Sequence, residues 1–170
     1  MSAYYAALVG RIRQSLVDLE RVVSRAELLM DKMRRTGDDG YLDGVALNLH
    51  GFYAGVERVF EDIAREIEGT VPTGPDWHQD LLLQMSAEVV ATRPAVVTQE
   101  TRFCLDDYRG FRHIVRNVYA FNLRPARLQE LTAGLRGCYQ AVCRDVNTFV
   151  DFLERMAHSD EGNWGVKRER

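Results

Sequence analysis

The sequence predicts an all-α protein, an antiparallel bundle of about five helices. Apolar residues recur every three or four positions over long segments, and the breaks between these segments are short. Long helices joined by short connections favour an antiparallel bundle. The 170 residues, of which 46% are apolar and 28% charged, suit one globular domain with its own core. We expect this domain to span residues 1–160 and residues 161–170 to form a loose tail.

The first two helices are predicted at residues 3–35 and 41–68. Gly37 follows the first helix and suits its C-terminal cap. In the second helix, Gly51 and Gly55 lie near one face, where small side chains let another helix approach closely. A glycine inside a helix costs about 1 kcal/mol relative to alanine, so we expect packing at these positions to offset that cost.

The other three helices are predicted at residues 77–91, 98–119 and 125–158. Asp76 can cap the first of these, and Pro94 disfavours helix just beyond its end. The last has the clearest amphipathic pattern in the chain, with apolar residues in steps of three or four throughout.

Cysteine content and hydropathy predict a cytoplasmic protein. Cys104, Cys138 and Cys143 are an odd number without a secretory signal, which indicates reduced thiols, and the last two read as small core residues. Their spacing does not match a metal clip, and we expect neither a metal nor a cofactor. No stretch reaches the roughly 18 uncharged apolar residues of a transmembrane helix, so no membrane contact is expected.

Positive charge is concentrated in one window, although the net charge of the chain is −3. Residues 100–127 hold six arginines and three acids, a net of +3, which leaves −6 for the rest. On an ideal helix, Arg109, Arg112 and Arg116 lie on one side. This pattern predicts a site for RNA or phosphate, but it fits a solvated face of local ion pairs about equally well.

The segment Tyr108-Arg-Gly-Phe-Arg-His-Ile-Val-Arg-Asn-Val-Tyr119 resembles the signature of the HEPN superfamily, in the form found in HepT-type toxins. That signature has an arginine followed by a polar residue, then a histidine and, after one further residue, a tyrosine. Arg112, His113 and Tyr119 fill the arginine, polar and tyrosine positions. Asn117 stands where the histidine is expected. The resemblance covers roughly residues 40–158, including Val45-Ala-Leu-Asn-Leu-His-Gly-Phe-Tyr53, Glu57-Arg58 and Pro75-Asp-Trp-His78.

The resemblance implies a toxin that cleaves RNA without a metal, by attack of the ribose 2′-hydroxyl on the adjacent phosphate. It also implies a homodimer in which the motif helices of two protomers form the cleft. HepT-type toxins are paired with an antitoxin, a nucleotidyltransferase. This antitoxin silences the toxin by AMPylation of the motif tyrosine, here Tyr119. Added bulk and negative charge beside Arg112 and Arg116 would block a phosphate site.

The resemblance also assigns roles within the motif. Arg112 becomes the phosphate clamp, because its planar fork donates two hydrogen bonds to phosphate oxygens, and Arg109 and Arg116 become auxiliary phosphate-binding charges. Asn117 can form hydrogen bonds but cannot transfer protons at pH 7. Three outcomes stay open: His113 acts as the base, the enzyme is slow and works by charge and positioning, or catalysis is lost.

The third outcome defines the alternative function, a catalytically inactive relative. Such a protein binds RNA or a nucleotide, or acts only as the partner of a nucleotidyltransferase. A plainer option is a helical module whose arginine face meets an acidic protein. His50 and His78 are interpreted as packing or capping residues.

Overall fold

The structure is a computed structural model that describes the backbone of residues 3–117 and 122–164 and the side chains of residues 5–115 and 122–157. Within these ranges the α-helices are α1 (Ala3–Thr36), α2 (Tyr41–Ile63), α3 (Trp77–Met85), α4 (Gln99–Asn117) and α5 (Pro125–Trp164). A π-helical segment, η1 (Ala64–Glu68), continues α2. The all-α fold class is confirmed, and no strand occurs in the described ranges.

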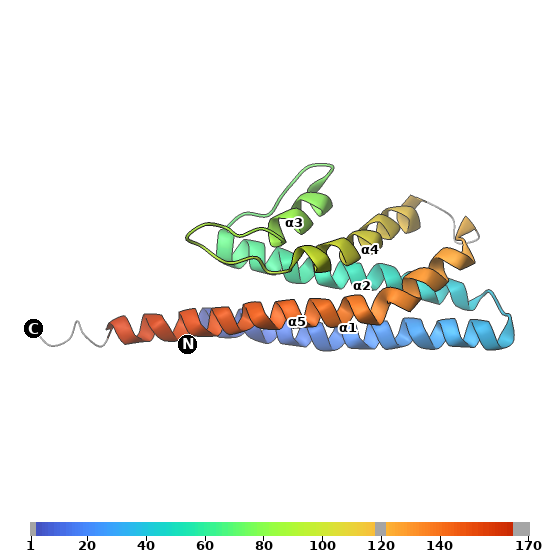
Figure 1. Cartoon of the computed structure of the whole chain (residues 1–170), viewed down its shortest axis with the longest axis horizontal. Coiled ribbons are helices and arrows are strands. Elements are labelled where there is room, and N and C mark those ends of the chain that lie inside the picture. Colours follow the sequence, from blue (N-terminus) through green and yellow to red (C-terminus); the bar gives the residue numbers. More distant parts are fainter. Residues whose placement is uncertain (1–2, 118–121, 165–170) are drawn as a thin grey trace, which may run out of the picture.

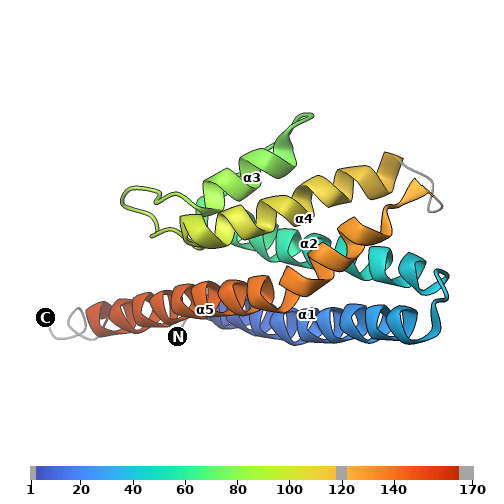
Figure 2. The same ribbon diagram turned by 45° about the vertical axis from the view of Figure 1, so that its right-hand side comes forward.

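Three long helices form the body of the molecule (Figure 1). α1 and α2 make an antiparallel hairpin, and α5 packs against both. α4 crosses over α2 and α5, and α3 lies on the outer side of α2 and α4 (Figure 2). This arrangement brings the far end of α2, the start of α3 and the later part of α4 together.

Glycines allow the close approach of α1 and α2. A Cβ atom built on Gly55 would lie 2.7 Å from Leu19 Cδ2, and one on Gly44 would lie 2.7 Å from Leu29 Cδ1. Gly37 ends α1 at a φ of 72°, which an L side chain rarely adopts, and its N–H donates to the carbonyl of Met33 at 2.8 Å. The predicted cap and the predicted close helix contact at Gly55 are therefore confirmed. At Gly51 an added Cβ would meet only Val22 Cγ1, at the ordinary contact distance of 3.9 Å, so the prediction of a close contact there is wrong.

Two helix ends differ from the prediction. α3 ends at Met85 and not at residue 91, and Ala91 has a φ of 58°. The chain turns back there, with the Val89 N–H donating to the Arg93 carbonyl at 2.9 Å. At its start, Asp76 makes no side-chain cap hydrogen bond, so that prediction is wrong. α5 continues beyond residue 158 to Trp164.

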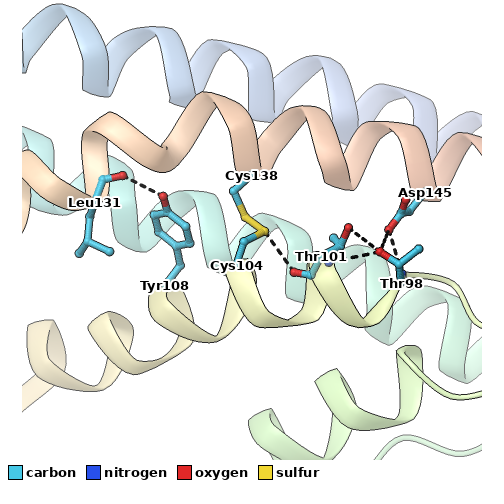
Figure 3. The surroundings of a disulfide bond; sticks show 7 residues. All are labelled: Thr98, Thr101, Cys104, Tyr108, Leu131, Cys138 and Asp145. Atoms are coloured by element: carbon cyan, nitrogen blue, oxygen red, sulfur yellow. Dashed lines mark hydrogen bonds between the residues drawn. A yellow bond between two sulfur atoms is a disulfide. The ribbon is translucent and has the colours of Figure 1, made fainter.

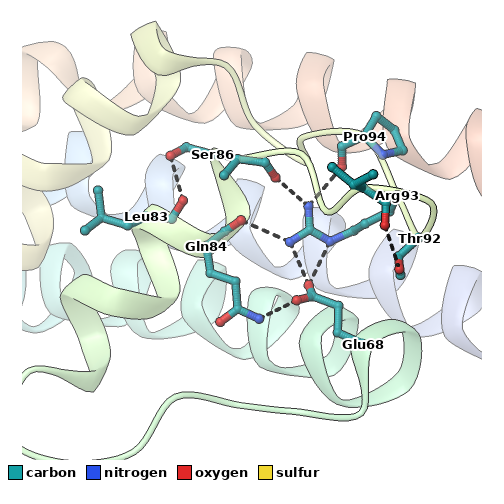
Figure 4. Close-up of polar contacts among 9 residues, drawn as sticks. Glu68, Leu83, Gln84, Ser86, Thr92, Arg93 and Pro94 are labelled. Carbon is teal, nitrogen blue, oxygen red and sulfur yellow. Dashed lines mark hydrogen bonds and ion pairs between the residues drawn. The ribbon is translucent and has the colours of Figure 1, made fainter.

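Arg93 holds this turn in place from inside the protein (Figure 4). Its side chain is fully buried, and its Nε and Nη2 lie 2.7 and 2.6 Å from Glu68 Oε1. The same guanidinium donates to the carbonyls of Gln84, Ala87 and Pro94 at 2.9–3.0 Å. These bonds satisfy backbone carbonyls that a longer α3 would have paired, which explains why the helix stops early.

The N-terminus of α4 is fastened to α5 through Asp145 (Figure 3). Thr98 caps the helix, since its Oγ1 accepts from the Thr101 N–H at 3.2 Å. Asp145 Oδ2 accepts from the N–H and the hydroxyl of Thr98, at 2.8 and 3.0 Å. Burial raises the pKa of Asp145, but hydrogen bonds from Thr101 and Thr98 lower it by more, so the net shift is downward.

Replacing Asp145 with alanine should lower the free energy of unfolding by about 2–3 kcal/mol, because the amide of Thr98 loses its buried partner. Since the pKa of Asp145 is lowered on folding, its contribution is present above the unfolded pKa of about 3.9 and fades as the pH falls through the folded value. Urea unfolding at pH 7 and in acid measures both effects. Exposed Asp151 on the same helix gives the control, and an Asp145→Ala protein as stable as Asp151→Ala would contradict the assignment.

A disulfide joins Cys104 of α4 to Cys138 of α5 (Figure 3). The prediction of reduced thiols is therefore wrong for these two residues, while Cys143 is a free thiol whose pKa is raised by burial. The pairing has no sequence signal, because the partners lie 34 positions apart on different helices with Cα atoms 5.9 Å apart. Beside it, the hydroxyl of Tyr108 donates to the Leu131 carbonyl at 2.8 Å.

None of the helices in the described ranges combines the length and the apolar character that crossing a membrane would require.

Candidate functional site

Glu57, His78 and Arg112 meet from three different helices. His78 Nδ1 lies 2.6 Å from Glu57 Oε2, and Arg112 Nη1 lies 2.6 Å from His78 Nε2. Arg112 Nη2 reaches the other carboxylate oxygen of Glu57, Oε1, at 3.6 Å. α2, α3 and α4 therefore each supply one member of a closed triad.

The hydrogen bonds of this triad define the state of the imidazole. The carboxylate of Glu57 can only accept, so Nδ1 of His78 carries the proton and donates it. Arg112 Nη1 lies 2.6 Å from Nε2 and 2.8 Å from Nδ1. A position this close to both ring nitrogens lies over the face of the imidazole, and the ring also packs against Trp77 at a centroid distance of 3.7 Å.

The triad is largely removed from water. The side chains of Glu57, Arg112 and His78 are 5%, 14% and 21% exposed, so their mutual attraction is weakly screened. Nε of Arg112 is buried without a hydrogen-bond partner. An unpaired buried donor costs about 1–3 kcal/mol. An acceptor that bonds to Nε would remove this cost, which favours reorientation of the guanidinium toward it.

Such an acceptor can enter through a small pocket on the outer side of the triad. The pocket measures about 200 Å³ and is formed by the loop before α3, by α3 itself and by α4. Its lining comprises Pro75, Asp76, His78, Gln79, Arg109, Arg112 and His113. The structure thus brings together three of the predicted site residues, Arg109, Arg112 and His113, with His113 exposed at the rim.

A nearby carboxylate partly neutralises the positive charge of the pocket. Arg109 Nε donates to Asp106 Oδ1 at 2.7 Å, one turn earlier on α4. On α2, burial raises the pKa of Tyr53, the charge of Glu57 adds to the rise, and the tyrosine stays neutral. Two guanidinium groups, of Arg109 and Arg112, therefore line the pocket, and each is paired with a carboxylate, of Asp106 and Glu57 respectively.

Two other arginines of the predicted basic window, Arg127 and Arg102, make local contacts at the surface, and those of Arg127 are ion pairs. Arg127 donates to Glu130 at 2.9 Å and to Asp107 at 3.3 Å, and these acids raise the pKa of Arg127 above its usual value. Arg102 Nε donates to Gln99 Oε1 at 2.7 Å. Away from the pocket, the solvated-face interpretation of the arginines therefore fits the described contacts.

The side chains of three predicted site residues lie outside the part of the chain that the structure describes. Arg116 and Asn117 belong to the last turn of α4, but their side chains lie outside the described part of the chain. Tyr119, the predicted AMPylation target, lies outside the described residues altogether. The roles of all three stay predictions.

Sequence reasoning missed the two partners of Arg112. His78 was interpreted as a capping or packing residue, and Glu57 appeared only as part of a resembling segment. Their distance from the motif along the chain hides the contact, because no local period links positions 57, 78 and 112. Within the described residues, no group of His, Cys, Asp and Glu side chains could hold a metal ion.

Comparison with known proteins agrees with the motif. The family model for HepT-like protein matches residues 44–153, a stretch that includes the whole Glu57–His78–Arg112 triad. No curated protein and no solved structure matches the chain. Because the matched stretch covers more than half of the sequence, the chain belongs to the HepT-like protein family.

Proposed function

We propose that this protein is a HEPN-type endoribonuclease toxin whose phosphate-binding group is Arg112. The observation that carries the proposal is the position of this arginine. It occupies the motif position of the family, lines a pocket and lies 2.6 Å from an imidazole nitrogen.

The chemistry follows from these groups. Attack of a ribose 2′-hydroxyl on the adjacent phosphate builds negative charge on the phosphate oxygens. The fork of Arg112 neutralises that charge by donating paired hydrogen bonds, and Arg109 adds a second positive charge. Family resemblance makes the reaction metal-independent, with a 2′,3′-cyclic phosphate and a 5′-hydroxyl as products.

A second copy of the chain completes the cleft in this proposal. A pocket of about 200 Å³ is smaller than the roughly 300–1,000 Å³ of most ligand sites. It suits one phosphate group but not a stretch of RNA. α4 also exposes two apolar side chains, Phe103 (64%) and Ile114 (44%), but on an ideal helix both lie on the side opposite Arg112 and outside the proposed cleft.

Regulation by a partner belongs to the same proposal. A cognate nucleotidyltransferase in the cytoplasm would transfer AMP to Tyr119, two positions after Asn117. The bulky anion would then compete with RNA for Arg112 and Arg116. The family membership of the chain supports a toxin–antitoxin setting for this partner.

A second candidate function is a catalytically inactive relative that binds RNA or acts only as the partner of the nucleotidyltransferase. Asn117 at the motif histidine position favours it. So does the ion pair between Arg112 and Glu57, because it partly neutralises the guanidinium.

Expression without a partner separates the two functions. We expect induced wild-type protein to arrest bacterial growth and, when purified, to cleave RNA in the presence of EDTA, leaving 2′,3′-cyclic phosphate ends. Affinity for RNA should fall with rising salt concentration. Intact RNA and unaffected growth, combined with salt-dependent RNA binding, would instead establish an inactive RNA-binding relative. No RNA binding even at low salt would exclude both RNA functions and leave only the role as a partner of the nucleotidyltransferase.

A further inference from the structure

A proton-transfer group is missing from the motif itself. Asn117 occupies the position of the motif histidine, and an amide side chain does not exchange protons at neutral pH. An imidazole does so readily. The described pocket contains two imidazoles, His78 from α3 and His113 from α4.

The contacts of these two histidines differ. His78 donates to Glu57 through Nδ1 at 2.6 Å, and Arg112 Nη1 lies over its ring, 2.6 Å from Nε2 and 2.8 Å from Nδ1. Packing on Trp77 fixes the plane of its ring. His113 lies exposed at the rim of the pocket. A base is effective when its acceptor nitrogen is held beside the reacting group, and the ring of His78 is held in place by Glu57 and Trp77.

We propose that His78, although it lies outside the motif, is the general base of this enzyme, with Glu57 as its positioning residue. The inference rests on the proposed ribonuclease function and adds the proton-transfer residue that the motif lacks. A carboxylate that accepts from Nδ1–H fixes the tautomer in which Nε2 carries the lone pair, the arrangement used by many catalytic histidines.

The reaction can be written for these atoms. An entering phosphate accepts from Arg112, whose Nη1 turns away from the ring of His78, and whose buried Nε gains an acceptor. Nε2 takes the proton of the 2′-hydroxyl as the 2′-oxygen bonds to phosphorus. The P–O5′ bond breaks, and the 5′-oxygen leaves with the electron pair and takes a proton from water. The imidazolium returns its proton to solvent.

Charged groups face His78 from every element around it. Glu57 approaches from α2, Asp76 precedes it in the loop, and Arg109, Arg112 and His113 approach from α4. With His78 as base, the dependence of the cleavage rate on pH should change when His78 is replaced. Replacement of exposed Arg21 on α1, which does not line the pocket, should leave that dependence unchanged.

The experiment compares purified variants on a labelled 30-nucleotide RNA of random sequence, at several pH values. His78→Ala should cleave at least about 10²-fold more slowly than wild type, the lower end of typical acid–base contributions. His78→Asn retains a donor for Glu57 and protects the fold, yet it should be equally slow. His113→Ala removes the other imidazole of the pocket. A large loss of rate in His113→Ala together with fast cleavage by His78→Ala would assign the base to His113 and overturn the inference.

Added imidazole provides the readout that a structural role would not move. It should restore cleavage by His78→Ala at least several-fold and leave Arg112→Ala unchanged. If wild type cleaves RNA and both His78 variants cleave equally fast, His78 is not the base, although the ribonuclease function stands. The same holds if the His78 variants are slow but added imidazole fails to restore cleavage. Intact RNA with wild-type protein would overturn the ribonuclease function and this inference together. Thermal unfolding of each variant verifies that it is folded.

Discussion

Replacing Arg112 with alanine should slow RNA cleavage by about 10²–10³-fold, the loss typical when one donor to a developing oxyanion is removed. The same change should relieve growth arrest on induced expression. The guanidinium lies on the pocket wall and is the group best placed to meet a phosphate. Rates of cleavage of a labelled RNA, measured below saturation, give the loss directly.

Two further variants make this result specific. Arg112→Lys keeps the charge but loses the planar fork, so it should recover only part of the rate. Arg21→Ala removes an arginine of α1 that is 78% exposed and should cleave like wild type. Because Arg112 also pairs with buried Glu57, the combined change Glu57→Gln with Arg112→Ala verifies that stranded charge has not unfolded the protein. Wild-type rates in Arg112→Ala would refute the phosphate-clamp role.

Replacing Arg93 with alanine should lower the free energy of unfolding by about 3–5 kcal/mol, the usual cost of breaking a buried ion pair. The substitution strands Glu68, whose side chain is only 7% exposed, and removes the donor for three backbone carbonyls. The turn after α3 should loosen first. Urea unfolding followed by circular dichroism measures the loss.

Arg65 is the matched control for this prediction. It lies in η1 beside Glu68, is 58% exposed and forms ion pairs with Glu61 and Asp62 at the surface. Arg65→Ala should change stability by no more than about 1 kcal/mol. If both variants lose the same small amount, the buried pair does not stabilise the turn. Adding Glu68→Gln to Arg93→Ala should recover part of the loss, since it removes the stranded charge.

The helices could be predicted from the sequence because their signals are local. The apolar period of α1 and α5, the glycine that ends α1 and the threonine that caps α4 each act within a few residues. The end of α3 could not be predicted in this way. Arg93 is eight positions beyond Met85, and its effect depends on Glu68 from another element.

The candidate site shows the same division between local and distant signals. Arg112 and His113 could be found because the motif is contiguous in one helix. Glu57 and His78 could not be assigned a role, because only the packing of α2, α3 and α4 brings them to Arg112. An acid and a histidine in separate segments carry no sign of a shared hydrogen bond, so their ordinary interpretation is a surface or packing residue.

The disulfide between α4 and α5 makes part of the chain a covalent ring. The ring runs from Cys104 to Cys138 and contains the whole motif segment. A proteinase that cuts inside it opens the ring without releasing a fragment, so the two pieces separate only after reduction. In a compartment rich in thiols the ring opens, and α4 is then held to α5 by noncovalent contacts, which are buried apolar side chains and the hydrogen bonds of Tyr108 and Asp145. The redox state of its surroundings thus decides whether a covalent bond adds to these contacts.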